Sequence, residues 1–140
     1  MEIGMAPCRF CRIAAGEGDG FVFESGISVA FLDTRPLFPG HTLLIPREHY
    51  ETLADLPADV VGPFFTGVQA LNRAVEKAMG AEGIFNAINN RVSQSVPHLH
   101  VHIVPRRKGD GLRGFFWPRG KYRDEAEAAA VREAIRAALR

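Results

Sequence analysis

Apolar and polar side chains alternate in the stretch 95–105, which reads Ser-Val-Pro-His-Leu-His-Val-His-Ile-Val-Pro. Successive side chains of a β-strand point to opposite faces of its sheet, so this pattern predicts a strand with His98, His100 and His102 on one face. A proline near each end bounds a run that is too short for a helix. We expect the aliphatic face to belong to the core and the histidine face to carry chemistry.

Short apolar runs bounded by turn residues predict four further strands. They cover residues 21–24, 27–33, 41–45 and 84–88. Ser25 and Gly26 separate the first two runs, which predicts a β-hairpin. Pro39 and Gly40 turn the chain into the third.

Apolar residues recur at helical spacing from residue 54 to residue 79. Pro57 suits the first turn of a helix and Gly80 suits its end. Pro63 lies inside the pattern, so we expect either a kink or a helix that starts after Pro57. These apolar positions indicate packing and not a cofactor site.

The C-terminal part is basic and then helical. Residues 106–123 contain seven of the 17 lysines and arginines, together with Phe115, Phe116 and Trp117. Such a composition can bind single-stranded nucleic acid, but it more often forms a solvated loop, and we expect no nucleic-acid partner. Residues 124–139 predict an Ala- and Glu-rich helix with Asp124 as its N-cap.

Composition limits the remaining possibilities. At 140 residues, the chain is long enough to bury roughly 70% of its unfolded surface in one core, so we expect one domain over 1–140 with a helical extension from residue 119. No run of 18 apolar residues occurs, and the first residues lack the pattern of a signal peptide. We therefore expect a cytoplasmic protein without a membrane span. A net charge of +1 favours no particular partner.

Three histidines on one strand face indicate a functional site more than a structural one, because every imidazole N–H needs a partner. On a strand rising ~3.3 Å per residue, His98 and His102 lie ~13 Å apart at Cα, so all three rings around one ion would strain a regular strand. The spacing favours divided roles, with one end of the row free to bind a metal and the middle free to react.

Cys8 and Cys11 form a Cys-x-x-Cys motif within a short helical or irregular segment, residues 8–17. This spacing fits half of a tetrahedral zinc site, and cytosolic conditions disfavour a disulfide. A redox pair and two buried thiols are the alternatives. The sequence offers no compact second half of a zinc site.

The chain resembles the histidine triad (HIT) family of nucleotide hydrolases and transferases, whose signature is His-x-His-x-His. The resemblance covers about residues 8–117 and rests on the triad stretch and on several blocks in register with it. These blocks are residues 8–13 (Cys-Arg-Phe-Cys-Arg-Ile), 30–33 (Ala-Phe-Leu-Asp), 39–46 (Pro-Gly-His-Thr-Leu-Leu-Ile-Pro), 47–49 (Arg-Glu-His) and 94–96 (Gln-Ser-Val). It implies an α+β fold with a mainly antiparallel five-stranded sheet, one long helix and a C-terminal helix.

The resemblance implies cleavage at the α-phosphate of a nucleotidyl substrate. A neutral imidazole can attack phosphorus without a separate base, and His100 in the middle of the row is the expected nucleophile. His98, His102 and His41 complete the implied catalytic set. A covalent nucleotidyl-His100 intermediate would then be released by water.

Residues for substrate binding are implied by position. Asp33 would accept the ribose hydroxyls, and Phe31 and Leu32 would lie beside the base; Asp33 could equally start a turn, and both apolar residues could be core. Polar side chains of the loop before the triad would contact phosphate or the departing group, namely Asn89 (or Asn90), Gln94 and Ser95. Trp117-Pro118 is similar to a C-terminal Trp-Pro that reaches the partner's pocket in one branch.

A structural zinc ion is also implied, with Cys8, Cys11, His49 and His98 as its ligands and no organic cofactor. The expected substrate is a purine nucleotide, with adenine as the family's usual base, and the expected assembly is a homodimer. Two alternatives stay open: a non-catalytic nucleotide-binding regulatory module, and a metal-dependent phosphohydrolase that uses the histidine row as ligands.

Overall fold

The computed structural model describes residues 8–112 and 120–139. Its backbone falls into two compact units, residues 1–110 and 111–140, of which the first contains the sheet and the histidine row. The expected single domain over the whole chain stays a prediction. In the described part of the chain, no helix has the length and apolar character needed to cross a membrane.

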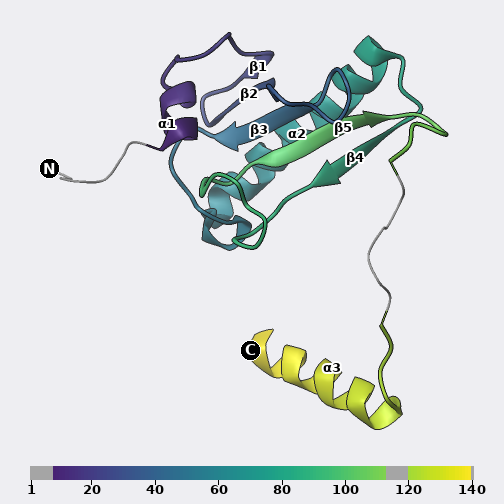
Figure 1. Ribbon diagram of the computed structural model, residues 1–140. Helices are drawn as coiled ribbons and strands as arrows, with labels where there is room; N and C mark the ends of the chain where they lie inside the picture. The colour runs from purple at the N-terminus through teal and green to yellow at the C-terminus, as the bar shows by residue number, and fades with distance from the viewer. Residues whose placement is uncertain (1–7, 113–119, 140) are drawn as a thin grey trace, which may run out of the picture. The chain divides into compact units, whose positions relative to one another are not determined.

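One five-stranded sheet forms the centre of the first unit (Figure 1). Its order is β1-β2-β3-β5-β4 and every neighbouring pair is antiparallel, which confirms the expected α+β class. The strands are β1 (Phe23–Glu24), β2 (Ser28–Leu32), β3 (Thr42–Pro46), β4 (Gly83–Ala87) and β5 (Val101–Arg106). The predicted hairpin is therefore correct, with shorter arms.

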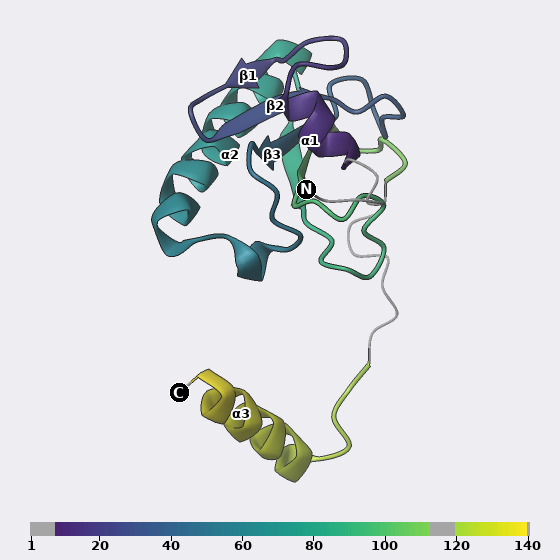
Figure 2. The same cartoon turned by 90° about the vertical axis from the view of Figure 1, so that its left-hand side faces the viewer.

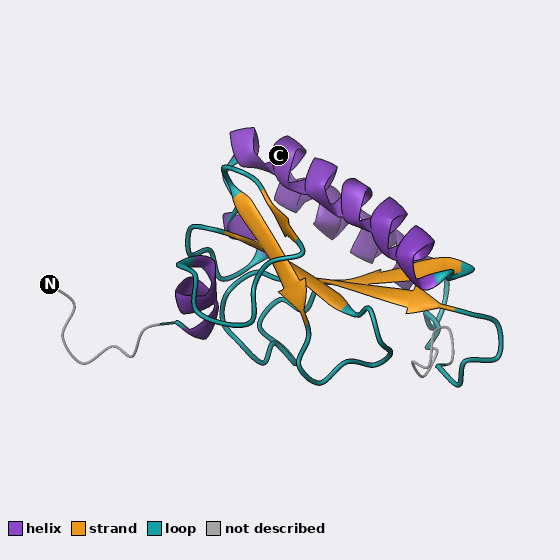
Figure 3. Cartoon of the chain, turned by 90° about the horizontal axis from the view of Figure 1, so that it is seen from above, coloured by secondary structure: helices purple, strands orange, loops and turns teal. Residues whose placement is uncertain are grey.

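The histidine strand begins later than the alternation predicted. β5 starts at Val101, so His98 and His100 lie in the loop that leads into it. Figure 3 shows the strands in orange and the loops that connect them in teal. The reason is the partner strand: Val101 faces Leu44, and in the same register Leu99 would face Pro46, which has no N–H to donate. The Leu99 N–H instead donates to the Tyr50 carbonyl at 2.6 Å.

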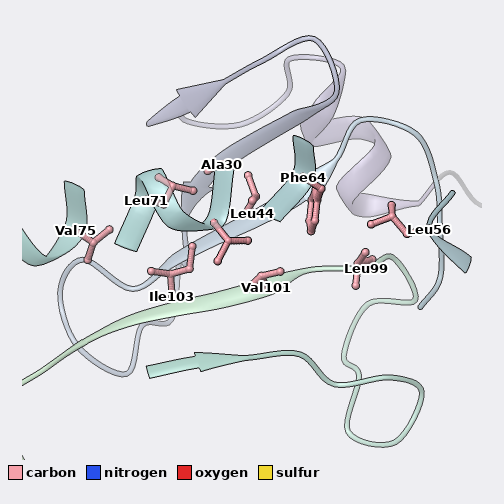
Figure 4. Packing of buried hydrophobic residues seen from close by; sticks show 10 residues of the cluster. Ala30, Leu44, Leu56, Phe64, Leu71, Val75, Leu99, Val101 and Ile103 are labelled. Atoms are coloured by element: carbon pink, nitrogen blue, oxygen red, sulfur yellow. The ribbon is translucent and has the colours of Figure 1, made fainter. Parts of the chain in front are cut away.

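The alternation of faces nevertheless continues through this loop. Leu99, Val101 and Ile103 all enter the main apolar core, as predicted, and Figure 4 shows them opposite residues of α2. The histidines between them lie outside that core cluster. The sequence pattern therefore identified the face of each residue correctly even where the strand ladder had ended.

The long helix α2 (Ala58–Met79) covers one face of the sheet (Figures 1 and 4). Pro57 occupies its N-cap position and Gly80 ends it with a left-handed backbone (φ 59°). The helix therefore starts directly after Pro57, and the first part of the apolar pattern belongs to a separate 3₁₀ helix, η1 (Leu53–Asp55). The helix continues through Pro63 without interruption.

Two shorter helices lie near the two ends of the sequence. α1 (Arg9–Ala14) lies beside β3 (Figure 2) and packs Phe10 into a second apolar cluster with Phe31 and Leu43. α3 (Glu125–Leu139) belongs to the second unit. Its predicted N-cap is confirmed, because the Glu127 N–H donates to Oδ1 of Asp124 at 2.8 Å.

Candidate active site and metal centre

A large open cavity of about 1120 Å³ brings most of the predicted site together. Its walls come from α1 and the segment after it, from β2 and the turn that follows, from β3, and from β5 with the segment that leads into it. They include Phe10, Phe31, Asp33, Ser95, His100 and His102. Apolar and polar side chains therefore face the same space, as a small-molecule site requires.

His100 is held in a single tautomer by the backbone. Its Nδ1 lies 2.7 Å from the carbonyl oxygen of His98, and a carbonyl can only accept, so Nδ1 carries the proton. The lone pair then resides on Nε2, the atom that a nucleophilic imidazole needs. The residue lines the cavity although only 3% of it is exposed.

Two consecutive hydrogen bonds fix the tautomers of His41 and His102. The Leu37 N–H donates to Nδ1 of His41 at 3.0 Å, so neutral His41 carries its proton on Nε2. That Nε2–H donates to Nδ1 of His102, also at 3.0 Å. Neutral His102 therefore has its proton on Nε2, so a hydrogen-bond donor accompanies the free lone pair of His100.

Burial keeps these two rings neutral near pH 7. Burial and the charges of His100 and His41 lower the pKa of His102 to about 4. Burial also lowers the pKa of His41, although Asp33 opposes this effect from 3.6 Å. Neutral rings preserve the alternating donor and acceptor arrangement from the Leu37 backbone to His102.

A separate group of donors fits a metal ion. One ligand atom from each of Cys8, Cys11, His49 and His98 lies within 4.8 Å of the others. Nδ1 of His98 is 3.4 Å from Sγ of Cys8 and 3.6 Å from Sγ of Cys11, and Nδ1 of His49 is 3.3 Å from Sγ of Cys11. In a tetrahedral zinc site, sulfur and nitrogen ligands lie ~3.6 Å apart, so these spacings match.

The surroundings of His98 also suit a metal. Its Nε2–H donates to the Pro46 carbonyl at 2.9 Å, which leaves the Nδ1 lone pair directed at the cysteines. Burial, followed by hydrogen bonding and charge repulsion with Cys8, raises the pKa of the Cys11 thiol to about 11. A bound dication would reverse this, because a coordinating thiol loses its proton.

Asp33, His41 and His102 also have donor atoms within 4.8 Å of one another, but they fit a metal poorly. Because Nδ1 of His41 already accepts the Leu37 N–H, an ion on its Nε2 would leave no proton on the ring. A metal-bound histidine normally donates its other N–H. Asp33, His41 and His102 are therefore better suited to fixing ring protons through hydrogen bonds than to binding an ion.

The predicted substrate contacts divide into two sets. Phe31, Leu32, Asp33 and Ser95 line the cavity, and Leu32 is 54% exposed. Asp33 accepts the Arg35 N–H through Oδ1, which is the turn role given as its alternative, and its contact with ribose stays a prediction.

The amides of the loop before the triad are engaged elsewhere. Gln94 donates to the Glu51 carbonyl at 2.7 Å and accepts the Arg91 N–H at 2.8 Å, so its side chain braces the loop. Asn90 accepts the Leu53 N–H at the start of η1. Asn89 is exposed and outside the cavity lining. Trp117 lies outside the described residues.

The sequence interpretation missed Phe10. Its ring meets the His100 ring edge to face, with centroids 5.0 Å apart, and it lines the cavity. The sequence feature that could have identified Phe10 is its position between the two cysteines, because a motif interpreted for metal binding alone also contains an aromatic residue.

The chain is similar to known proteins over most of its length. A family model for the HIT domain matches residues 17–109. An adenylylsulfatase from Arabidopsis thaliana, HINT3, is 37% identical over 108 residues, which is 75% of this chain and 55% of that protein. An asymmetrical bis(5'-nucleosyl)-tetraphosphatase from Schizosaccharomyces pombe is 36% identical over 95 residues, or 66% of this chain and 52% of that protein. The chain thus spans about half the length of these two relatives.

One solved structure that this chain resembles is described as zinc-bound. A Zn-bound histidine triad family protein from Mycobacterium smegmatis superimposes with a TM-score of 0.70 and 34% identity. The superposition covers 91% of this chain and 96% of that one.

Proposed function

This chain belongs to the HIT domain family, and from that premise we propose that it is an enzyme cleaving nucleotidyl substrates at the α-phosphate. HIT relatives include the adenylylsulfatase and the dinucleoside tetraphosphatase named above. The observation that carries the proposal is the His100 imidazole, which lines a cavity: its Nδ1–H donates to a carbonyl, and its Nε2 has no hydrogen-bond partner among the described residues.

The proposed reaction has two displacements. In the first, Nε2 of His100 forms a bond to the α-phosphorus, and the bond from phosphorus to the leaving group breaks with its electron pair. In the second, water displaces His100 and releases the nucleotide, so that overall the leaving atom gains a hydrogen and phosphorus gains a hydroxyl. In this proposal, Nε2–H of His102 donates a hydrogen bond to a phosphoryl oxygen or to the departing atom.

The cavity suits a nucleoside. Phe10, Phe31 and Leu32 supply apolar walls for a base, with adenine the proposed one. The Asp33 carboxylate would accept ribose hydroxyls through its remaining lone pairs, and Ser95 in the same lining would contact phosphate. The proposed substrates are dinucleoside polyphosphates and nucleoside phosphoramidates.

We propose a structural zinc ion held by Cys8, Cys11, His49 and His98. Four protein ligands leave no open position for substrate, so such an ion would stabilise the fold around the site. The remaining proposals are a homodimer acting in the cytoplasm without a nucleic-acid partner.

The test is turnover of a substrate panel in the presence of EDTA. Diadenosine tetraphosphate and adenosine 5'-phosphoramidate are each incubated with the protein, and metal content is measured in parallel. We expect turnover to persist while the four-ligand metal stays bound. Loss of turnover with that metal still bound would favour an ion at the reacting phosphate, and tight AMP binding without turnover would favour a regulatory module.

A further inference from the structure

The orientation of the His100 ring requires contacts beyond its hydrogen bond. Rotation of a histidine ring about its last side-chain torsion is broad and weakly restricted. One hydrogen bond, from Nδ1 to the His98 carbonyl, fixes a single point of the ring. Two ring contacts supply the rest: His102 at a centroid distance of 5.0 Å and Phe10 at the same distance with an interplanar angle of 89°.

Phe10 is itself held from two directions. It is 4% exposed and packs against Phe31 at 5.5 Å within the apolar cluster beneath α1. Cys8 and Cys11, which precede and follow Phe10 in the sequence, supply the second anchor, because the sulfur atoms of both belong to the metal group. A six-residue helix is too short to be stable alone, so α1 depends on these two anchors.

We infer that Phe10 is a positioning residue that links the metal centre to the nucleophile. The cysteines hold α1 in place, α1 holds the Phe10 ring, and the edge contact keeps the His100 ring aimed with Nε2 toward the α-phosphate. This inference rests on the proposed function for its kinetic consequence, but the hold on the ring is a property of the protein alone. The metal centre then affects the chemical step without touching substrate.

A wall of the base site and a positioning residue predict different kinetics. If Phe10 only contacts the base, its loss raises KM. If it aims His100, its loss lowers kcat, since small misplacements of a reacting group are costly in rate.

The experiment compares Phe10→Leu with Phe10→Tyr and with Phe64→Leu, a matched loss in the fully buried core between α2 and the sheet. We expect Phe10→Leu to lower kcat about tenfold with KM within about threefold, and with the metal content of the wild type. Phe10→Tyr, which keeps the aromatic ring edge against His100, should retain most of the wild-type kcat. Phe64→Leu should lower stability and keep kcat.

A second readout needs no substrate. Nitrogen-15 NMR of the His100 ring should show a proton on Nδ1 alone in the wild type, and a shift toward averaged nitrogen signals in Phe10→Leu and in metal-stripped wild type. Unchanged His100 signals in either sample, or a change in KM alone, would overturn the inference. Absence of turnover in the wild type would instead count against the proposed function, and the NMR comparison would still decide the role of Phe10.

Discussion

The ring nitrogen Nδ1 of His100 lies 2.7 Å from the backbone carbonyl oxygen of His98. The same His98 directs its own Nδ1 at two cysteine sulfurs and donates from Nε2 to Pro46. One residue thus serves the metal group with its side chain and orients the neighbouring imidazole with its backbone. Because these two roles share a residue, the metal centre and the proposed nucleophile are connected through His98 as well as through Phe10.

Replacing His100 by alanine should abolish turnover and leave nucleotide binding largely intact. The cavity keeps its apolar walls and Asp33, so the Kd for AMP should stay within about tenfold of the wild-type value. Steady-state kinetics and titration calorimetry measure the two quantities. Turnover near the wild-type rate in His100→Ala would remove this residue from its proposed role.

Zinc content should be close to one ion per chain and should be lost in Cys8→Ala. Cys8 contributes one of four ligands, and the three that remain, Cys11, His49 and His98, would hold an ion with much lower affinity. Elemental analysis and thermal unfolding of both proteins measure the effect. Full stability of metal-free wild type would count against a structural ion.

His102 should make stability depend on pH below neutrality. Its pKa is about 4 in the folded chain and about 6.5 when unfolded, so the unfolded chain takes up a proton first as pH falls. The contribution of neutral His102 to the free energy of unfolding is therefore complete above pH 6.5 and is lost as the pH falls toward 4. Urea unfolding at pH 7.5 and 5.0 should show the wild type losing up to about 2 kcal/mol more than His102→Asn. Equal losses in the two proteins would contradict the assignment.

Ser93 has a left-handed backbone, with φ at 62°, in the loop before the triad. A side chain is strained there and glycine is not, so Ser93→Gly should raise the free energy of unfolding by up to about 1 kcal/mol. Val92 is the matched control, since it is 81% exposed and has no such φ. Val92→Gly should destabilise, and the same sign for both variants would refute the strain.

Sequence patterns predicted the histidine and core faces of residues 98–103 because side-chain alternation is a local property. They placed the start of β5 too early because that boundary depends on Pro46, a residue of another strand. The hold of Phe10 on His100 was out of reach for the same reason, since the two residues meet only through folding. The tautomer of His41 depends on where the turn places the Leu37 N–H, which no spacing rule supplies.

The loop amides show the limit of transferring roles by position. Gln94 was expected to contact phosphate, yet its amide spans the Glu51 carbonyl and the Arg91 N–H. Gln94 therefore stabilises the loop that carries it, a role that its position in the motif did not indicate. Whether Gln94 also reaches substrate stays a prediction.

A covalent bond between His100 and phosphorus can be detected by mass spectrometry of protein that is rapidly denatured during turnover. With an adenylyl substrate, we expect a fraction of chains to be heavier by one adenylyl group, located on the peptide that contains His100 and absent from His100→Ala. Rapid turnover with unmodified protein at every sampled time, or the group attached to another residue, would contradict it.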